Sequence, residues 1–179
     1  MSPTDFVDRS PFRVTVLATG GTLEKSYDAR SGQLSLAAPV IDGLLEQLDM
    51  PDVAVRVERL MAKDSLDMTD ADRQAIVAEV QRILDEETVD AVLVTHGTDT
   101  LADTAMALHA ALAPAAPVVL TGAMRPYRVA ASDGLQNVAQ ALMAARLLAP
   151  GVYAVMHGRA IAADRVCKDY ERLTLTTRA

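Results

Sequence analysis

The chain repeats one pattern, in which a short apolar run closed by turn residues is followed by a longer segment with helical spacing. The runs are rich in Val and Leu and mostly lack polar alternation, which is typical of strands covered on both faces. They read RVTVLAT (13–19), VAVRVERL (53–60), DAVLVTH (90–96), PVVLTGA (117–123) and GVYAVMH (151–157). Strands alternating with helices predict an α/β fold: a doubly wound, mostly parallel, Rossmann-like sheet with right-handed crossovers and helices on both faces.

The helical segments carry start signals. Pro39 stands where a first helical turn favours proline, and Thr69 precedes a segment with acids in its first turn and an apolar stripe. A third helix is expected to begin near Thr100 or Leu101, and a fourth at Ser132 as its N-cap.

Length and composition indicate one domain. With 179 residues, half of them hydrophobic, the chain can bury a sizeable core. We therefore divide it into an N-terminal extension, residues 1–12, and one α/β domain, residues 13–179. The first residues are polar and no stretch reaches the length of an uninterrupted membrane span, so we expect a cytoplasmic protein without a membrane partner.

Charge and cysteine content narrow the functions. The formal charge of -7 disfavours nonspecific binding to nucleic acid. One cysteine, Cys167, permits neither an intramolecular disulfide nor a paired-cysteine zinc site. His109 and His157 lack carboxylate or cysteine partners at metal-ligand spacing, so we expect no metal and no other cofactor.

Two threonines stand just past strand ends, where parallel sheets bind ligands. Thr22 closes the stretch ATGGT and Thr98 lies in VTHGTDT. Gly20 and Gly21 permit a sharp turn and a close approach of backbone N–H groups to a ligand. Taken alone, this stretch is equally typical of a structural turn. A phosphate-binding loop is poorly supported because neither glycine-rich nucleotide motif is present.

A threonine hydroxyl needs a positioned base to act as a nucleophile. Tyr27 could supply it from residues 23–36, a polar segment with a central Ser-Gly that favours a flap or hairpin over the site. Asp99 is either a helix cap or part of a relay with Thr98 and a distant lysine. His96 is expected to be a structural hydrogen-bond donor.

Four motifs in this order, ATGGTL, THGTDT, TGAMRP and ASDGLQN, resemble the amino-terminal domain of bacterial-type L-asparaginases, the threonine amidohydrolases. The resemblance runs from about Arg13 to Lys168. It implies hydrolysis of the side-chain amide of asparagine, or in some members glutamine, through an acyl-threonine.

The resemblance assigns catalytic roles. It makes Thr22 the nucleophile and Tyr27 the flap tyrosine that helps to activate it. Thr98, Asp99 and Lys168 match a second triad, in which Thr98 activates or positions the attacking water, Lys168 holds its hydroxyl and Asp99 takes the substrate ammonium.

The resemblance also assigns the substrate pocket. Ser65, which by itself passes for a turn residue, matches the serine that binds the α-carboxylate. Backbone N–H groups near Gly21, Thr22 and Thr98, with the carbonyl of Ala123, would line the amide pocket and supply the oxyanion hole.

The sequence also departs from the long-chain pattern. Long-chain members have a second α/β domain that completes the neighbouring subunit's site, whereas this sequence ends eleven residues after Lys168, as in short-chain members. Leu66 stands where a polar amide side chain usually contacts substrate. We expect a homo-oligomer, a dimer or tetramer, acting on L-asparagine; the alternatives are another amide substrate, glutamine or a modified amide, and a non-catalytic amino-acid-binding module.

Overall fold

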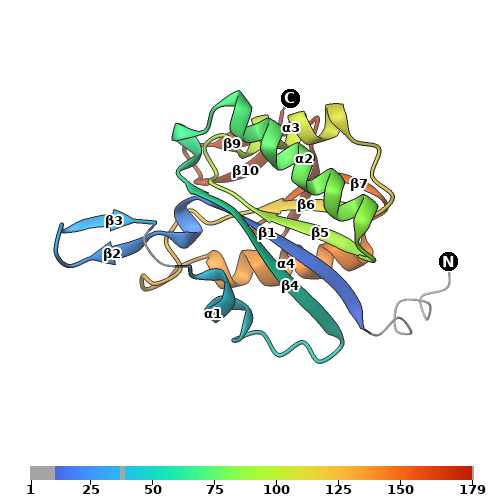
Figure 1. Ribbon diagram of the computed structural model, residues 1–179. Coiled ribbons are helices and arrows are strands. Elements are labelled where there is room, and N and C mark those ends of the chain that lie inside the picture. Colours follow the sequence, from blue (N-terminus) through green and yellow to red (C-terminus); the bar gives the residue numbers. More distant parts are fainter. Residues whose placement is uncertain (1–10, 37–38, 179) are drawn as a thin grey trace.

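A six-stranded sheet forms the centre of the fold in the computed structural model, which describes residues 11–36 and 39–178 (Figure 1). The predicted extension therefore lies outside the described residues except for its last two. The strand order is β4-β1-β5-β6-β7-β8, parallel except for β8. The strands are β1 (Phe12–Gly20), β4 (Val53–Lys63), β5 (Ala91–Thr95), β6 (Pro117–Thr121), β7 (Gly151–Met156) and β8 (Arg159–Ala162). All five predicted strands are confirmed.

The strand order fixes where a ligand can bind. The chain passes from β1 outward to β4 and then back across β1 to β5, so its direction of winding reverses between β1 and β5. In open parallel sheets the crevice at such a reversal, beyond the carboxyl ends of the strands, is the usual ligand site. Thr22 follows β1 and Thr98 follows β5, so the predicted threonines flank this point.

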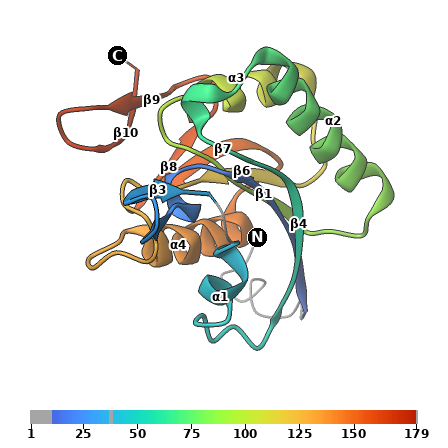
Figure 2. The same ribbon diagram turned by 60° about the vertical axis from the view of Figure 1, so that its left-hand side comes forward.

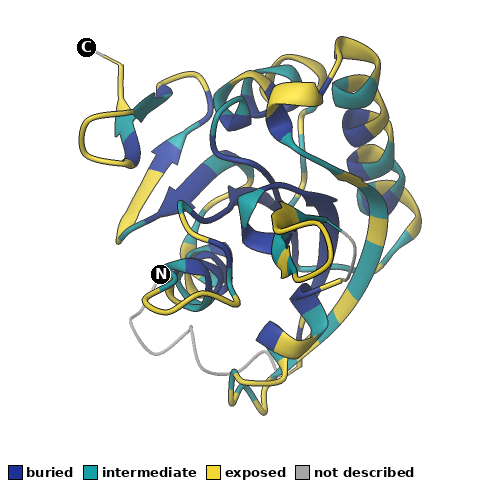
Figure 3. Ribbon diagram, turned by 90° about the vertical axis from the view of Figure 1, so that its left-hand side faces the viewer, coloured by how far each residue is buried: buried dark blue, intermediate teal, exposed yellow. Residues whose placement is uncertain are grey.

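Helices cover both faces, as predicted. The helices are α1 (Ile41–Leu45), α2 (Asp70–Glu86), α3 (Leu101–Ala111) and α4 (Gly134–Leu147). One core cluster packs α2 and α3 against the sheet, and the other packs α1 and α4 against the opposite face (Figure 1). The central strands are buried between these layers, while exposed residues lie on the outer helix faces and the loops (Figure 3). The expectation of two covered faces is wrong for the edge strand β4, whose exposed and half-buried residues alternate along most of its length.

Two antiparallel hairpins stand outside the main sheet (Figure 2). The first pairs β2 (Ser26–Asp28) with β3 (Gln33–Ser35), which confirms a hairpin in residues 23–36. The second pairs β9 (Val166–Asp169) with β10 (Thr174–Thr177). Both emerge on the side of the sheet where the strands β1, β5 and β6 end (Figure 1).

The helix starts test the expected caps. Thr69 caps α2 through a capping box with Asp72, as predicted. The expectation for Pro39 is wrong by two residues, because α1 begins at Ile41. Ser132 is not the cap of α4: Asp133 occupies that position, and the Asp133 carboxylate is engaged by the preceding loop instead. Among the described residues, no helix combines the length and apolar character that a membrane span requires.

Candidate active site

The turns after β1 and β5 touch at two glycines. Gly21 has a φ of 80°, and a Cβ added there would lie 2.5 Å from the Cα of Gly97. A Cβ on Gly97 would in turn lie 2.6 Å from the Cβ of Ser65. These contacts are too close for any side chain, so glycine is needed for the ends of β1, β5 and β4 to converge. Thr22 and Thr98 are therefore held on adjoining turns.

The structure brings Thr98, Asp99 and Lys168 together. The Lys168 Nζ donates to the Thr98 Oγ1 at 2.9 Å and lies 2.8 Å from the Asp99 Oδ1. Thr98 is buried and the Lys168 side chain is only 11% exposed, so little water screens this ion pair. Because the ammonium donates to the threonine oxygen, the hydroxyl proton of Thr98 must point elsewhere. This geometry fixes the direction in which Thr98 can donate or lose its proton.

Lys168 reaches this position from a distant hairpin. Its Nζ also lies 5.0 Å from the ring centroid of Tyr170, close enough for a cation–π contact. Asp64 and Lys25 form a second ion pair nearby, and the Lys25 and Lys168 ammonium groups both lower the pKa of Asp64, Lys25 chiefly by hydrogen bonding.

His96 supports the β5 turn and takes no part in the cluster. It is fully buried, with its Nδ1 2.8 Å from the Gly97 carbonyl and its Nε2 2.9 Å from the Thr104 hydroxyl. The carbonyl can only accept, so Nδ1 carries the proton and Nε2 accepts from Thr104. Burial lowers the pKa of His96 to about 4. The predicted structural role fits this neutral, doubly bonded ring.

Thr22 and Tyr27 are less constrained. Thr22 begins a 3-10 turn, Thr22–Glu24, and is half-buried; its hydroxyl forms no hydrogen bond with a described residue. Tyr27 lies on β2 with 67% of its surface exposed, and its phenol likewise has no hydrogen-bond partner among the described residues. The structure thus places Thr22 beside the Thr98 cluster but leaves Tyr27 on a hairpin that extends from the body (Figure 1).

Ser65 and Leu66 follow β4 on the same side. Ser65 is fully buried against Gly97, and its Oγ has no hydrogen-bond partner among the described residues. A buried hydroxyl without a partner is costly, which suits an atom that a ligand satisfies. Leu66, in contrast, is 70% exposed, so the residue that replaces a polar amide points into solvent.

One expected oxyanion donor is already used. The Gly21 N–H donates to the Lys63 carbonyl at 2.8 Å, so it is not available to a ligand. The turn and loop hydrogen bonds of the described residues do not include the N–H groups of Thr22 or Thr98 as donors. The backbone donors at the convergence point are therefore Thr22 and Thr98.

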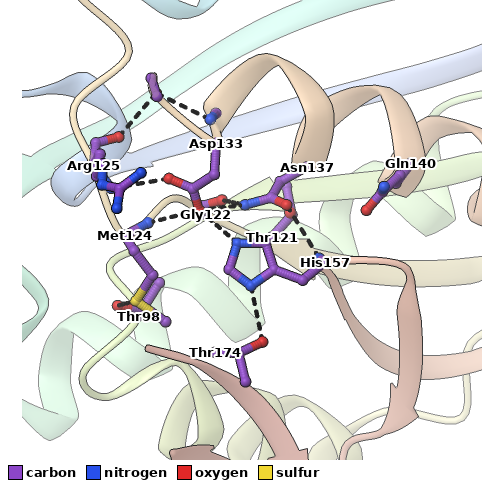
Figure 4. Close-up of polar contacts among 12 residues, drawn as sticks. Thr98, Thr121, Gly122, Met124, Arg125, Asp133, Asn137, Gln140, His157 and Thr174 are labelled. Carbon is purple, nitrogen blue, oxygen red and sulfur yellow. Dashed lines mark hydrogen bonds and ion pairs between the residues drawn. The ribbon is translucent and has the colours of Figure 1, made fainter. Parts of the chain in front are cut away.

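A loop after β6 closes the site, and its organiser escaped the sequence analysis. Ala123 is fully buried there. The Asp133 carboxylate accepts from the N–H groups of Met124, at 2.9 Å, and Arg125, at 3.0 Å, and these bonds lower its pKa (Figure 4). Asn137 donates to the Gly122 carbonyl at 2.9 Å. The motif ASDGLQN contained both residues, but no local pattern says that they hold a loop eight to fifteen residues upstream.

Glu24 is the other group that sequence reasoning missed. It follows Thr22 by two residues, is only 6% exposed, and its Oε1 has no hydrogen-bond partner among the described residues. Burial raises the pKa of Glu24 to about 7, against the opposing charge of Arg59.

We find no cluster of three or more potential metal ligands among residues 11–36 and 39–178. His109 is exposed on α3, and His157 bonds to Asp133 and Thr174.

Comparisons with known proteins place this geometry in a family. Residues 13–172 match the family model described as asparaginase, N-terminal. The chain is 30% identical over 162 residues to L-asparaginase 2 of Bacillus subtilis, covering 87% of this chain and 43% of that protein. It is 31% identical over 166 residues to one component of the Glutamyl-tRNA(Gln) amidotransferase of Methanococcus vannielii, covering 88% and 37%.

Among solved structures, the thermostable L-asparaginase from Thermococcus kodakarensis superposes with a TM-score of 0.83 at 30% identity. The match covers 92% of this chain and 51% of that chain. The chain thus spans about half the length, or less, of the relatives it matches. It belongs to the asparaginase family and corresponds to that family's N-terminal domain.

Proposed function

We propose that the protein hydrolyses the side-chain amide of L-asparagine to L-aspartate and ammonia through an acyl-threonine intermediate. The observation that carries the proposal is the Thr98–Lys168–Asp99 cluster, buried beside the turn of Thr22 at the switch point of the sheet. Amide hydrolysis needs a nucleophile, oxyanion donors and a proton path to ammonia, and side chains and backbone can supply all three without a metal.

In the first step Thr22 Oγ1 attacks the amide carbon, and Tyr27 takes the hydroxyl proton once the β2–β3 hairpin folds over the site. The N–H groups of Thr22 and Thr98 stabilise the oxyanion. The carbonyl of Ala123 orients the amide nitrogen, which leaves as ammonia after gaining a proton. In the second step Thr98, held by Lys168, positions the water that hydrolyses the acyl-threonine.

Recognition of the amino acid uses the remaining groups. Asp99 takes the substrate ammonium, because its second carboxylate oxygen is not used by Lys168. Ser65 binds the α-carboxylate, which would satisfy its unpartnered hydroxyl.

An ammonia-release assay on the purified protein tests this proposal. Asparagine should be turned over, and Thr22→Ala or Thr98→Ala should each abolish turnover. Full activity in both variants would contradict the assignment. Calorimetric binding of asparagine without any ammonia release by the wild type would instead support the non-catalytic binding module.

A second candidate keeps the chemistry and changes the amide. One relative is a component of an amidotransferase, and Leu66 offers no polar group to the substrate. Comparing kcat/KM for asparagine, glutamine and a modified amide decides between them; we expect asparagine to be preferred.

Assembly and location complete the proposal. We propose a cytoplasmic homo-oligomer in which a neighbouring copy covers the open site. Light scattering of the purified protein and fractionation of the producing cells test these two points.

A further inference from the structure

His157 lies at a junction that the proposed chemistry does not use. It follows β7 with a φ of 51°, in the left-handed region that few residues other than glycine adopt. Both ring nitrogens are engaged: Nε2 lies 2.9 Å from the Asp133 Oδ2 and Nδ1 lies 2.8 Å from the Thr174 Oγ1. Its backbone N–H donates to the Asn137 Oδ1 at 3.1 Å. A strained backbone held by three hydrogen bonds indicates that the ring position is strongly determined.

One side of the junction is the loop after β6. Asp133, which His157 contacts, accepts the N–H groups of Met124 and Arg125 (Figure 4). The Sδ of Met124 lies 3.5 Å from the Thr98 Oγ1 and accepts from it. The Asp133 carboxylate therefore fixes the backbone that carries Ala123 and the side chain that contacts Thr98.

The other side is the β9–β10 hairpin. Thr174 begins β10, is 9% exposed, and pairs with Asp169 in the residue register. Leu175, the next residue, pairs with Lys168. Because these two strands form a sheet of their own, the position of Lys168 depends on how the hairpin is held against the body. The bond from Thr174 to His157 is one such tie, one residue away from the Lys168 register pair.

We propose that His157 is a positioning residue that couples the two halves of the site. Through Asp133 it sets the loop of Ala123 and Met124, and through Thr174 it holds the hairpin that brings Lys168 to Thr98. It forms no hydrogen bond with Thr22, Thr98, Asp99 or Lys168 among the described residues, so it acts through other groups. This inference rests on the proposed function for its kinetic consequence, while its structural part stands by itself.

The structural part is tested by hydrogen exchange, which needs no activity. His157→Asn keeps a residue that tolerates the left-handed backbone but cannot reach both partners. We expect faster exchange in two segments, 123–126 and 166–177, with α2 unchanged. Thr174→Val removes only the hairpin tie and should speed exchange in 166–177 alone. Unchanged exchange in both variants would overturn the proposal, whether or not the protein turns over asparagine.

The kinetic part is tested by a double-mutant cycle. A displaced Lys168 should lower kcat by about 10- to 100-fold in His157→Asn, with KM changed less than about threefold. On a Lys168→Met background the same substitution should cost less than about twofold, since its effect passes through Lys168. His157→Gln, which can still donate to Asp133, should recover part of kcat.

His109→Asn, on the exposed end of α3, is the matched control and should leave kcat unchanged. An equal loss from His157→Asn on both backgrounds would contradict coupling through Lys168. A wild type that releases no ammonia would refute the proposed function, and the exchange experiment would still decide the role of His157.

Discussion

The two halves of the site differ in how far they are assembled without a ligand. Thr98, Asp99 and Lys168 are joined by hydrogen bonds of 2.8 and 2.9 Å and are largely buried. Thr22 and Tyr27, on the β1 side, form no side-chain hydrogen bonds with described residues, and Tyr27 is exposed. The first half is preorganised, whereas the second needs the hairpin to close.

Their buried polar neighbours differ in the same way. His96, below Thr98, has both ring nitrogens bonded. Glu24, beside Thr22, is buried with an oxygen that lacks a partner among the described residues. Preorganised dipoles lower a barrier because they need no rearrangement during the reaction, so the difference teaches that closure on the β1 side is the step that a ligand must drive.

The largest effect is expected from Lys168→Met. Without the ammonium, the Thr98 hydroxyl loses its partner and Asp99 is left unpaired in a partly buried place. We expect kcat for asparagine to fall by about 10³-fold or more, measured as ammonia release. Lys63→Met is the control, because the Lys63 side chain pairs with Asp72 on α2 and should change kcat less than about twofold. Equal losses in the two variants would remove Lys168 from the site.

A smaller loss is expected from Tyr27→Phe. It removes the proposed base while leaving the hairpin intact, so kcat should fall by about 10- to 100-fold, in the lower range for general base catalysis. Tyr153→Phe, on β7, serves as the control. Wild-type kcat in Tyr27→Phe would show that the open hairpin contributes no base.

The contact between the two halves is tested by Gly97→Ala. The added methyl would press on Ser65, and we expect unfolding to become easier by about 1–3 kcal/mol in urea titrations. Gly43→Ala in α1 meets no atom within 4 Å and should be stabilising by about 0.5–1 kcal/mol. Similar effects in both variants would contradict the close approach of the strand ends.

The smallest effect concerns Glu24. Its pKa is raised from 4.5 to about 7, so the folded state keeps the proton to higher pH than the unfolded chain does. Wild-type stability should therefore fall as pH rises from 4.5 to about 7, and Glu24→Gln should remove this loss. Relative to wild type, the variant should gain about 1–2 kcal/mol between pH 4.5 and 8, less than the full shift because water screens the carboxylate. A constant difference across this range would show that Glu24 does not titrate as described.

Much of the fold was predictable because its signals are local. Apolar runs gave the five parallel strands, and the acids after Thr69 gave the start of α2. The start of α4 was mispredicted because the carboxylate of Asp133 bonds to Met124 and Arg125, a demand that is invisible in the sequence around Ser132.

The site was only half predictable for the same reason. The glycine turns before Thr22 and Thr98 mark strand ends, but Lys168 has no local signal and was singled out by resemblance alone. Lys168 meets Thr98 across seventy residues because a separate hairpin carries it there. His157 and Glu24 were missed since burial and tertiary partners, not spacing, give them their character.

The central claim is that the open half forms the acyl bond and the preassembled half hydrolyses it. Thr98→Val removes the hydroxyl with little change of shape, and its reaction with asparagine can be followed by mass spectrometry of the intact chain and its peptides. We predict about one ammonia released per chain, with an aspartyl adduct on Thr22. Sustained turnover, or an adduct on any residue other than Thr22, would contradict this division of labour.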